Sequence, residues 1–532
     1  MKLSMFLCGV VVAGVPVFGG TFESFTLPTP APGGSISYAD VQASFPGVNW
    51  ATLERLYIPA GHWRSIRLSN LPVRTPDHPL VITNVGGQVV SGGLGGTSHG
   101  FLLGGGANWI LTGEWDPVAE TGDPGFRGHA TRYAHSAGTY GIVIDNAFQA
   151  TGDSGLVVGG GATDFELAFI EVTRVGFAGA LIKTDNNGVA HMANVRIHDL
   201  YIHDTGSEGI YLGSTQNPPQ HKFPQLEIFN NRVVRAGTEL IQLGQVGRDS
   251  EIHHNVFVWG ALDWKNPFGP FQDNGGQFGV REGDAWFHHN ILIGGAASFF
   301  QFFPQPRDGD THLPGDTVLF SDNYFSHSRN FGAYLHAQSD LVTAFVFQDN
   351  WFRHIDFQYT ELDPGASNAN QVIRTFNTQS PMTFTGNTWS GPQTFLSSST
   401  PNITATGNNH ATEIPPIEFM ATGFAADVDY LGLEIWTALD TNGVPVQYGV
   451  GDHVVDNGVP GGGTVYRALV ANSGVTPGTN ASVWAVVPAL PDDLRLRPGS
   501  PFVGYGLLDV VVVLFEDGFE SGSTASWSAT AP

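Results

Sequence analysis

Cysteine is almost absent from this 532-residue sequence. The single example, Cys8, lies in an N-terminal segment where one positive charge, Lys2, precedes an apolar run from Met5 to Phe18. A short apolar run that follows a positive charge and ends in small residues is typical of a cleavable signal peptide, which we place at residues 1–20. The mature chain would then hold no cysteine, which excludes disulfides and cysteine-based nucleophile or metal chemistry. Its stability must therefore come from a large buried core.

Positive charge and long apolar runs are also scarce. The sequence has 23 Lys and Arg residues against 48 Asp and Glu, a formal net charge of −25. An acidic chain is a poor general binder of nucleic acid or anionic membranes, so we expect neither as a partner. No later segment is long and apolar enough to span a bilayer. Together with the signal peptide, this predicts a secreted, extracellular or cell-surface protein, which we expect to be a monomer.

What the sequence does have is abundant glycine (69), abundant phenylalanine (37) and a repeated six-residue pattern. The pattern is apolar, two polar or small residues, Asn, any residue, apolar, as in IHHNVF (252–257) and FQDNWF (347–352). Two early copies carry Ile170 and Leu200 at the Asn position. The other copies, 21 to 37 residues apart, carry Asn231, Asn255, Asn290, Asn323, Asn350, Asn387 and Asn408.

This repeat predicts an all-β solenoid. Each unit is a short alternating strand, a tight turn at Asn and another strand, because Asn tolerates left-handed backbone and can hydrogen-bond along a stack of equivalent side chains. One coil cannot bury its apolar face alone, whereas stacked coils share a continuous core. The helical periodicity of an α-solenoid is absent, and propeller blades need roughly 40–50 residues with a strict internal pattern. Most of the asparagines should therefore be structural rather than catalytic.

With this repeat, the chain resembles the pectate-lyase-like superfamily of right-handed, single-stranded parallel β-helices over roughly residues 35–425. The segments YADVQASFPGVNW (38–50) and RLYIPAGHWRS (55–65) are similar to the cap and first coils of such helices. The resemblance implies a parallel β-helix over residues 21–430. It also implies an extracellular polysaccharide as partner, although the superfamily includes lyases, glycoside hydrolases, epimerases and phage adhesins.

Residues 431–490 interrupt the repeat. This stretch resembles small chitin- and cellulose-binding modules, which carry Trp, then Tyr-x-x-Gly-Asp-x-Val, a second Tyr and a closing Trp. Exposed aromatic rings stack on sugars, whereas buried rings form the core of a small domain. We expect Trp484 in the core, while Trp436 and Tyr466 are candidate sugar-binding residues for which a core role is equally open. The matching positions are Trp436, Tyr448, Gly451, Asp452, Tyr466 and Trp484.

Two further segments follow this module. LRLRPGSPFVGYG (494–506) resembles the Leu-x-Pro-Gly-Ser-Pro ending of many β-helix proteins, which predicts a last coil at residues 491–510 and a module inserted before the helix finishes. LFEDGFESGSTASWS (514–528) resembles a C-terminal tail of many secreted proteins of Gram-negative bacteria. We therefore expect residues 511–532 to be a sorting tail or a disordered end.

A groove is predicted where strands follow the turns of successive coils. If Ile182, Leu212, Leu243 and Val280 point inward, alternation places outer rows two residues apart. Lys183 and Arg281 would then lie on the order of 14 Å apart at a coil spacing of about 4.8 Å, with glycines as a floor. The two rows are Leu181, Tyr211, Gln242 and Gly279, and Lys183, Gly213, Gly244 and Arg281.

Polar groups gather at one end of this groove. Glu208 and Glu239 occupy matching positions at strand starts, one coil apart, with Asp204 near the same end. The long insertions at 214–225 and 263–274 could wall the groove. Candidate substrate-binding residues are Gln242, Lys222, Lys265, Gln277 and Glu282.

A polysaccharide lyase is the function that the resemblance favours most. β-Elimination needs a uronate carboxylate neutralised by Ca²⁺ or basic groups, and a base such as Lys, Arg, His or Tyr at C5. Hard oxygen ligands could bind Ca²⁺, the one cofactor we consider. The candidate ligands are Asp204, Glu208 and Glu239. The candidate catalytic residues are Lys183, Tyr211, His221 and Arg281.

Two other functions stay open. A glycoside hydrolase needs two carboxylates roughly 5–9.5 Å apart, and Glu208 and Glu239 on adjacent coils would meet the short end of that range. The acidic balance and this pair favour hydrolysis, although the pair could also be a stacked polar ladder. The third possibility is a non-catalytic glycan-binding surface protein.

Two histidine pairs precede ladder asparagines. In His253–His254 and in His288–His289 we expect one ring to face outward and one to pack into the turn. A metal site at these rings is an open alternative to a purely structural role.

Overall fold

The computed structural model describes most of the region where the repeat occurs. The predicted signal peptide with Cys8 and the predicted tail at 511–532 lie outside the described residues. Within the described part, no helix combines the length and apolar character that a membrane crossing requires. The described residues are 23–29, 34–95, 99–113, 140–185, 189–214, 221–263, 272, 274–280, 283–295, 301–302, 313–336, 344–355, 371–376, 380–397, 402–420, 434–456, 464–487 and 493–508.

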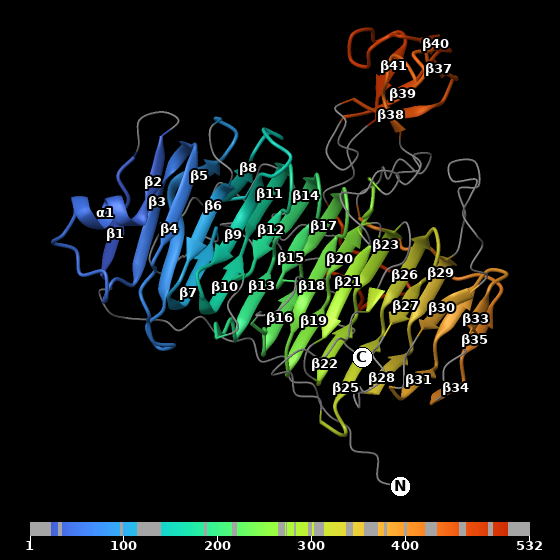
Figure 1. Cartoon of the computed structure of the whole chain (residues 1–532), viewed down its shortest axis with the longest axis horizontal. Coiled ribbons are helices and arrows are strands. Elements are labelled where there is room, and N and C mark those ends of the chain that lie inside the picture. The colour runs from blue at the N-terminus through green and yellow to red at the C-terminus, as the bar shows by residue number, and fades with distance from the viewer. Residues whose placement is uncertain are drawn as a thin grey trace, which may run out of the picture.

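The chain folds as a parallel β-helix, which confirms the predicted fold class (Figure 1). Each coil contributes one strand to each of three faces, and equivalent strands of successive coils pair in parallel. The first face is a 12-stranded sheet. Its strands are β2 (Ser35–Ser37), β4 (Ser65–Ser69), β6 (His99–Gly104), β9 (Ser154–Gly159), β12 (Ala180–Ile182), β15 (Ile210–Leu212), β18 (Ile241–Val246), β21 (Gly276–Val280), β24 (Gln301–Phe302), β27 (Ala333–His336), β30 (Gln371–Phe376) and β33 (Thr394–Ser397).

The second and third faces join in one 23-stranded sheet, because the early strands β1 (Ser24–Thr26), β3 (Arg55–Trp63) and β5 (Leu80–Ser91) connect them. The second face holds β7 (Ala107–Thr112), β10 (Thr163–Ala168), β13 (Val195–His198), β16 (Leu226–Phe229), β19 (Ser250–His253), β22 (Ala285–His288), β25 (Thr317–Ser321), β28 (Ala344–Gln348), β31 (Met382–Thr385) and β34 (Ile403–Thr406). The third face holds β8 (Ile142–Asp145), β11 (Ile170–Val175), β14 (Tyr201–Thr205), β17 (Arg232–Ala236), β20 (Val256–Val258), β23 (Ile291–Gly295), β26 (Tyr324–Ser328), β29 (Trp351–Ile355), β32 (Thr388–Ser390) and β35 (Asn409–Ala411).

A short helix, α1 (Tyr38–Ser44), closes one end of the solenoid (Figure 1). The Ser37 hydroxyl caps it by accepting a hydrogen bond from the Asp40 backbone N–H. Tyr38 and Val41 are buried against the first coils, where Trp50 packs edge-on against Tyr38. The helix therefore covers apolar side chains that have no preceding coil to stack on.

Apolar side chains stack in register along the interior. One row runs Ile252, Phe287, Phe320, Phe347 and Phe384 through five successive coils. Phe320 and Phe347 are parallel, with ring centroids 4.6 Å apart and an interplanar angle of 14°. Offset stacking of this kind adds to the energy of burial. The abundance of phenylalanine in the sequence thus reflects a continuous core.

The seven asparagines form a hydrogen-bonded ladder at the turn between the second and third faces. From Asn255 onward, each Oδ1 accepts the backbone N–H and the side-chain Nδ2–H of the asparagine one coil earlier. For Asn290 onto Asn323 both distances are 3.0 Å. The asparagines from Asn231 to Asn387 are fully buried, as the structural interpretation predicted. The ladder begins at Leu200, whose N–H donates to Asn231 Oδ1.

The left-handed residue of this turn is not the asparagine itself. It is the residue before it, with φ of 55° at Asn230, 52° at His254, 53° at His289 and 53° at Asp322. The left-handed backbone therefore lies one position earlier than the repeat predicted. The asparagine instead serves the turn through its side chain, because the left-handed residue leaves a backbone N–H that needs an acceptor on the next coil.

The small module is described over residues 434–456 and 464–487 and is built separately from the coils (Figure 1). One sheet contains β36 (Glu434–Ile435), β38 (His453–Val455), β39 (Val465–Ala468) and β41 (Trp484–Val486), and a second pairs β37 (Gln447–Tyr448) with β40 (Asn472–Ser473). Mostly antiparallel pairing distinguishes it from the solenoid. The interruption of the repeat therefore coincides with two small sheets that do not pair with the coils.

The segment expected to be the last coil takes another position. Residues 494–508 carry no parallel strand; Leu496 makes an antiparallel bridge to Phe419 instead. Phe502 packs on Tyr324 with centroids 4.8 Å apart, and the Tyr505 hydroxyl accepts a hydrogen bond from Trp351. Apolar side chains on the outer side of the third face need a cover, and this segment supplies it.

We expect Asn290→Ala to lower the free energy of unfolding by about 3–5 kcal/mol, because the buried N–H and Nδ2–H groups of Asn255 lose their acceptor. Asn408→Ala removes the same two bonds from Asn387 at the partly exposed end of the ladder, where water can replace them. It should cost about 1–2 kcal/mol. Denaturant unfolding of both variants measures the difference, and equal losses would contradict the role of burial.

Candidate active site

The outer row of the first face carries the candidate site. Leu181, Tyr211 and Gln242 follow one another on β12, β15 and β18, as predicted. On β21 the paired residue is Gln277, not Gly279, and the inward residue beside Leu243 is Phe278. Through the backbone pairing of β24, the same register continues to Tyr334 and Arg374. The sequence predicted Gly279 at the β21 position of the row, whereas the structure has the amide side chain of Gln277 there.

The cause of this register error is a backbone irregularity in β18. Between the pairs Leu243–Phe278 and Val246–Val280, β18 advances three residues while β21 advances two. Strict alternation, on which the prediction rested, cannot detect such a bulge. Arg281 and Glu282 lie outside the described residues, and so does Lys265.

The predicted glycine floor is not an open surface. A Cβ atom at Gly244 would meet the carbonyl group of Ser214 at 2.9–3.0 Å, and one at Gly279 would meet the Gly244 oxygen at 3.1 Å. Gly213 has φ +69° and approaches Gln245. These glycines are therefore needed where neighbouring coils approach closely, and not to seat a sugar ring.

Glu208 and Glu239 do occupy equivalent positions on adjacent coils. The N–H of Gly209 donates to the Glu239 carbonyl at 2.9 Å, which fixes their stacking. Both residues are almost fully buried, with exposures of 2% and 0%. Gln277 Nε2 donates to Glu239 Oε1 at 2.7 Å, which brings this carboxylate to the outer row. The pair is therefore brought together as predicted.

Burial acts strongly on Glu208. Loss of solvation raises the pKa of its carboxyl group, and hydrogen bonds from its own backbone and from Ser207, with the charge of Lys183, offset this only in part. A carboxyl group whose pKa is raised holds its proton to higher pH and can donate it. Glu208 is thus suited to general acid chemistry.

Lys183 and Tyr211 lie beside this pair. The Lys183 ammonium is 4.5 Å from the centre of the Tyr211 ring and 3.2 Å from Asp185 Oδ2. Tyr211 is 6% exposed, and the neighbouring Gln242 is 1% exposed. The structure therefore gathers one cation, one phenol and the amides of the outer row around the two carboxylates.

His221 does not fit the role of a base. The Thr184 backbone N–H donates to its Nε2 at 2.9 Å, which occupies the lone pair that would take a substrate proton. Its Nδ1 faces the Lys222 carbonyl at 3.4 Å, and burial lowers the pKa of the ring. The histidine instead fastens the end of its insertion to the strand end of β12.

Asp204 belongs to another cluster, on the third face. Its Oδ2 is 2.6 Å from His203 Nδ1, and its Oδ1 pairs with Arg235. Burial alone would raise the pKa of Asp204, but Arg235 and His203 hold it below its usual range. Both oxygens are engaged, so Asp204 does not join Glu208 and Glu239 in a calcium site. Ca²⁺ binding by this protein stays a prediction.

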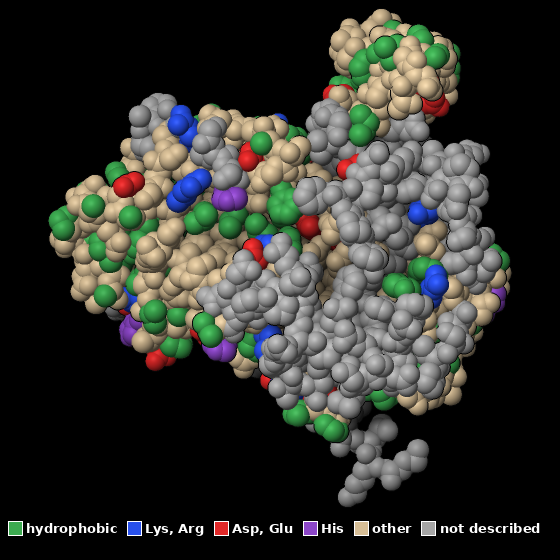
Figure 2. All heavy atoms as spheres, in the orientation of Figure 1, with side chains coloured by type: hydrophobic (Ala, Val, Ile, Leu, Met, Phe, Trp, Pro, Cys, Tyr) green, Lys and Arg blue, Asp and Glu red, His purple; other side chains and the backbone are tan. Residues whose placement is uncertain are grey.

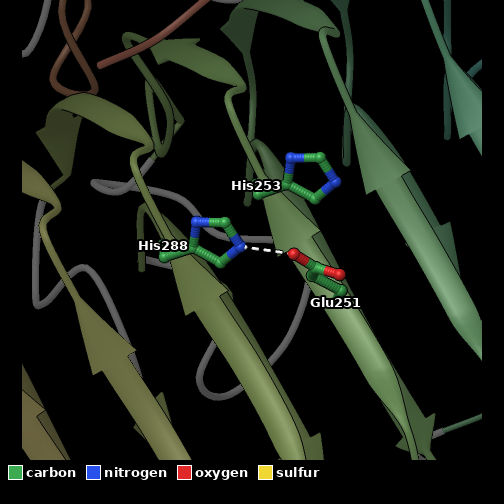
Figure 3. Close-up of side chains that lie close together, drawn as sticks. All are labelled: Glu251, His253 and His288. Atoms are coloured by element: carbon green, nitrogen blue, oxygen red, sulfur yellow. Dashed lines mark hydrogen bonds and ion pairs between the residues drawn. The ribbon is translucent and has the colours of Figure 1, made fainter. Parts of the chain in front are cut away.

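Residues with ligand atoms converge elsewhere. Among the described residues, one group of three such side chains lies close enough to hold an ion, and it is on the second face: Glu251, His253 and His288 (Figure 3). The paired histidines in the sequence were the signal for it. Their neighbour Glu251 was missed, because only the stacking of coils brings it to His288.

The aromatic residues of the small module mostly form its core. Tyr466 is 8% exposed and packs with Tyr448 and Trp484, which is 2% exposed. Trp436 is half-buried against the same cluster. The expectation for Trp484 is confirmed, whereas Tyr466 is too deeply buried to be a sugar platform. Trp436 keeps partial exposure.

Charge on the molecular surface is dispersed. On the face shown in Figure 2, the Lys and Arg side chains of the described residues are scattered among Asp and Glu and form no large basic patch. The described residues of this face therefore offer a polyanion no broad attractive surface.

Comparisons with known proteins return distant structural similarities. No family model matches the chain, and no curated protein matches it. An alginate lyase from Paenibacillus sp. str. FPU-7 is 13% identical, with a TM-score of 0.36 over 71% of this chain and 98% of that one. A GH136 lacto-N-biosidase from Eubacterium ramulus is 11% identical, with a TM-score of 0.35 over 67% and 62%. The A-module of a mannuronan C-5 epimerase from Azotobacter vinelandii is 12% identical, with a TM-score of 0.32 over 71% and 97%. The assignment of the fold rests on the strand pairing of this chain itself.

Below neutral pH, His203 should stabilise the fold. Burial lowers the pKa of its ring, but hydrogen bonds to Asp204 and Glu171 outweigh this and raise it to about 9. Since the unfolded pKa is about 6.5, this stability is fully present below pH 6.5 and is lost as pH rises through 9. In His203→Gln, the free energy of unfolding should fall less steeply with rising pH, by up to about 1.4 kcal/mol per pH unit. Urea unfolding from pH 6 to 10 measures it, with the exposed His78→Gln as control.

Proposed function

We propose that this protein is a secreted enzyme that hydrolyses a polysaccharide bound across β12, β15, β18 and β21. The observation that carries the proposal is the buried pair Glu208 and Glu239 on adjacent coils, one with a raised pKa and one hydrogen-bonded to Gln277. Two carboxyl groups whose surroundings differ in this way can divide the roles of acid and nucleophile.

The one-coil offset between the two residues favours a retaining mechanism. Coils of a parallel sheet lie about 4.8 Å apart, which matches the roughly 5 Å between the carboxyl groups of retaining glycosidases. Glu208 would protonate the leaving oxygen while Glu239 attacks the anomeric carbon. Water would then release the sugar from Glu239, with Glu208 accepting a proton from that water.

The outer row offers the contacts that a sugar chain needs. Tyr211, Gln242 and Gln277 carry phenol and amide groups that can donate to and accept from sugar hydroxyl groups. They are 6%, 1% and 3% exposed, so binding requires a rearrangement that opens this row to the sugar. These three side chains follow one another from coil to coil. A linear glycan could therefore lie along the solenoid axis, perpendicular to the strands.

We expect Glu208→Gln and Glu239→Gln each to lower kcat by about 100-fold or more, because each removes a group that transfers a proton or forms the covalent bond. The measurement is reducing-end release from a panel of neutral and uronate-containing glycans. Glu171→Gln is the matched control, since Glu171 is equally buried but lies on the third face beside His203. Intact activity in both site variants would sink the assignment.

The alkaline limit of activity should depend on Lys183. Its positive charge lowers the pKa of Glu208, so Lys183→Met should raise that pKa further and move the alkaline limb of the kcat profile to higher pH. Lys222→Met removes a positive charge that is not among the causes of the shift in the pKa of Glu208, and the limb should stay in place. A limb that moves to lower pH in Lys183→Met would contradict Glu208 as the acid.

β-Elimination is the second candidate, favoured by the position of Lys183 over the Tyr211 ring. A cation and a phenol side by side could neutralise a uronate and remove its C5 proton. The same assay separates the candidates, because a lyase yields an unsaturated product that absorbs in the ultraviolet, while a hydrolase yields reducing ends alone. Binding without either product would indicate a non-catalytic glycan-binding protein.

A further inference from the structure

The second face carries a stack of aromatic and acidic side chains outside the site described above. On its outer side, Phe229, His253 and His288 follow one another on β16, β19 and β22. The His253 and His288 rings are parallel, 5.0 Å apart with an interplanar angle of 3°. Glu251 lies two residues before His253 on β19, so its side chain is on the same side of the sheet (Figure 3).

We propose that Glu251, His253 and His288 bind a divalent transition-metal ion of the Zn²⁺ class. One ligand atom from each lies within 4.8 Å of the others, and His288 Nε2 is 2.7 Å from Glu251 Oε1. Two imidazoles and one carboxylate are the donors that Zn²⁺ and late first-row ions prefer, whereas Ca²⁺ and Mg²⁺ select oxygen.

Each ligand histidine is oriented by the next residue in the chain. His253 Nδ1 is 2.8 Å from His254 Nδ1, and His288 Nδ1 is 2.7 Å from His289 Nδ1. When the ligand ring donates from Nδ1 to its neighbour, its Nε2 keeps a lone pair for the ion. Such outer hydrogen bonds fix both the tautomer and the ring orientation of metal-binding histidines.

Packing holds the two rings in place from both sides. Phe229 stacks on His253 with centroids 5.3 Å apart, and Trp286 stacks on His288 at 3.7 Å. A tetrahedral ion with ligand distances of about 2.1 Å needs donors about 3.4 Å apart. Side-chain shifts on the order of 1 Å reach that geometry from the observed one.

Charge and exposure also suit a cation. Glu227 Oε1 lies 3.6 Å from His253 Nε2, which adds a second carboxylate near the ligands. Glu227 is itself held by Arg196, at 2.7 Å. The Glu251 side chain is 42% exposed, so one side of the cluster is open to water. Three protein ligands with an open position allow a bound water molecule.

The ion would join two coils, because Glu251 and His253 lie on β19 and His288 lies on β22. Binding to the folded chain alone would raise its thermal stability. This inference is independent of the proposed hydrolase, since the second face carries neither Glu208 nor Glu239. A variant that loses metal binding should therefore keep its activity in the glycan assay. A variant of Glu208 or Glu239 should keep its metal binding.

The test is titration of the chelator-treated full chain with Co²⁺ and Zn²⁺. We expect one equivalent bound per chain, a visible Co²⁺ absorption typical of a tetrahedral nitrogen and oxygen site, and a higher melting temperature with Zn²⁺. Ca²⁺ should produce none of these. No binding of either transition metal, or binding with no effect on the melting temperature, would overturn the proposal.

The solenoid supplies substitutions that keep the fold. Phe229 and Ser321 stand at the positions equivalent to His253 and His288 in flanking coils, so His253→Phe and His288→Ser should fold. These variants and Glu251→Gln should lower affinity by about 100-fold or more. His289→Asn, with the residue found at Asn230 in the equivalent left-handed turn, should lower it about 10–100-fold.

The matched control is His78→Gln. His78 Nδ1 is 3.0 Å from Glu54 Oε1, so this is also a His–Glu pair, but it is exposed and has no third ligand among the described residues. Its loss should leave the stoichiometric site unchanged. Equal binding by the wild type and by His253→Phe would show that the ion binds elsewhere and would overturn the assignment.

Discussion

The hydrogen bond from one asparagine to the next is the constraint on which the remaining structure depends. From Asn255 onward, each ladder Oδ1 accepts two donors from the previous coil, and each Nδ2–H also reaches a backbone carbonyl, as Asn290 does at Ile252. The asparagines from Asn231 to Asn387 are buried, so a slip by one residue would leave several of these groups unsatisfied. The ladder therefore fixes the register of the coils from Leu200 to Asn408 on their neighbours.

Because successive coils stack in register, residues at equivalent positions of the repeat lie close together in space. Residues at equivalent positions lie about one coil spacing apart, so like groups gather in rows. Phenylalanines gain from this in the core. Acidic groups such as Glu208 and Glu239, or Glu227 and Glu251, would repel one another. The structure places Gln277 and Lys183 beside the first pair, and Arg196 beside Glu227. Both candidate sites lie where neighbouring amides and cations offset only part of the repulsion between the carboxylates of such a row.

The three faces differ in what covers them. On the third face, apolar side chains such as Tyr324 and Trp351 pack against the segment that contains Phe502 and Tyr505. This contact encloses that face as a second apolar core. The outer row of the first face carries the amides of Gln242 and Gln277, and that of the second face carries Glu251, His253 and His288.

The sequence by itself determined the parts of the structure that depend on spacing along the chain. The repeat specified the solenoid, the ladder and the equivalence of Glu208 with Glu239, because each follows from counting residues between turns. The alternation also gave the correct row as far as Gln242. The histidine pairs were visible as a possible ligand set for the same reason.

Only the tertiary structure decided the rest. The irregularity in β18 brought Gln277 into the row, since a bulge leaves no mark on an alternating pattern. Asp204 has a left-handed backbone and contacts His203 and Arg235 instead of Glu208 and Glu239. The segment at 494–508 left the coil pattern and covered the third face, a contact between residues more than 150 positions apart. Each outcome depends on contacts between distant segments or on backbone irregularities, which residue spacing does not encode.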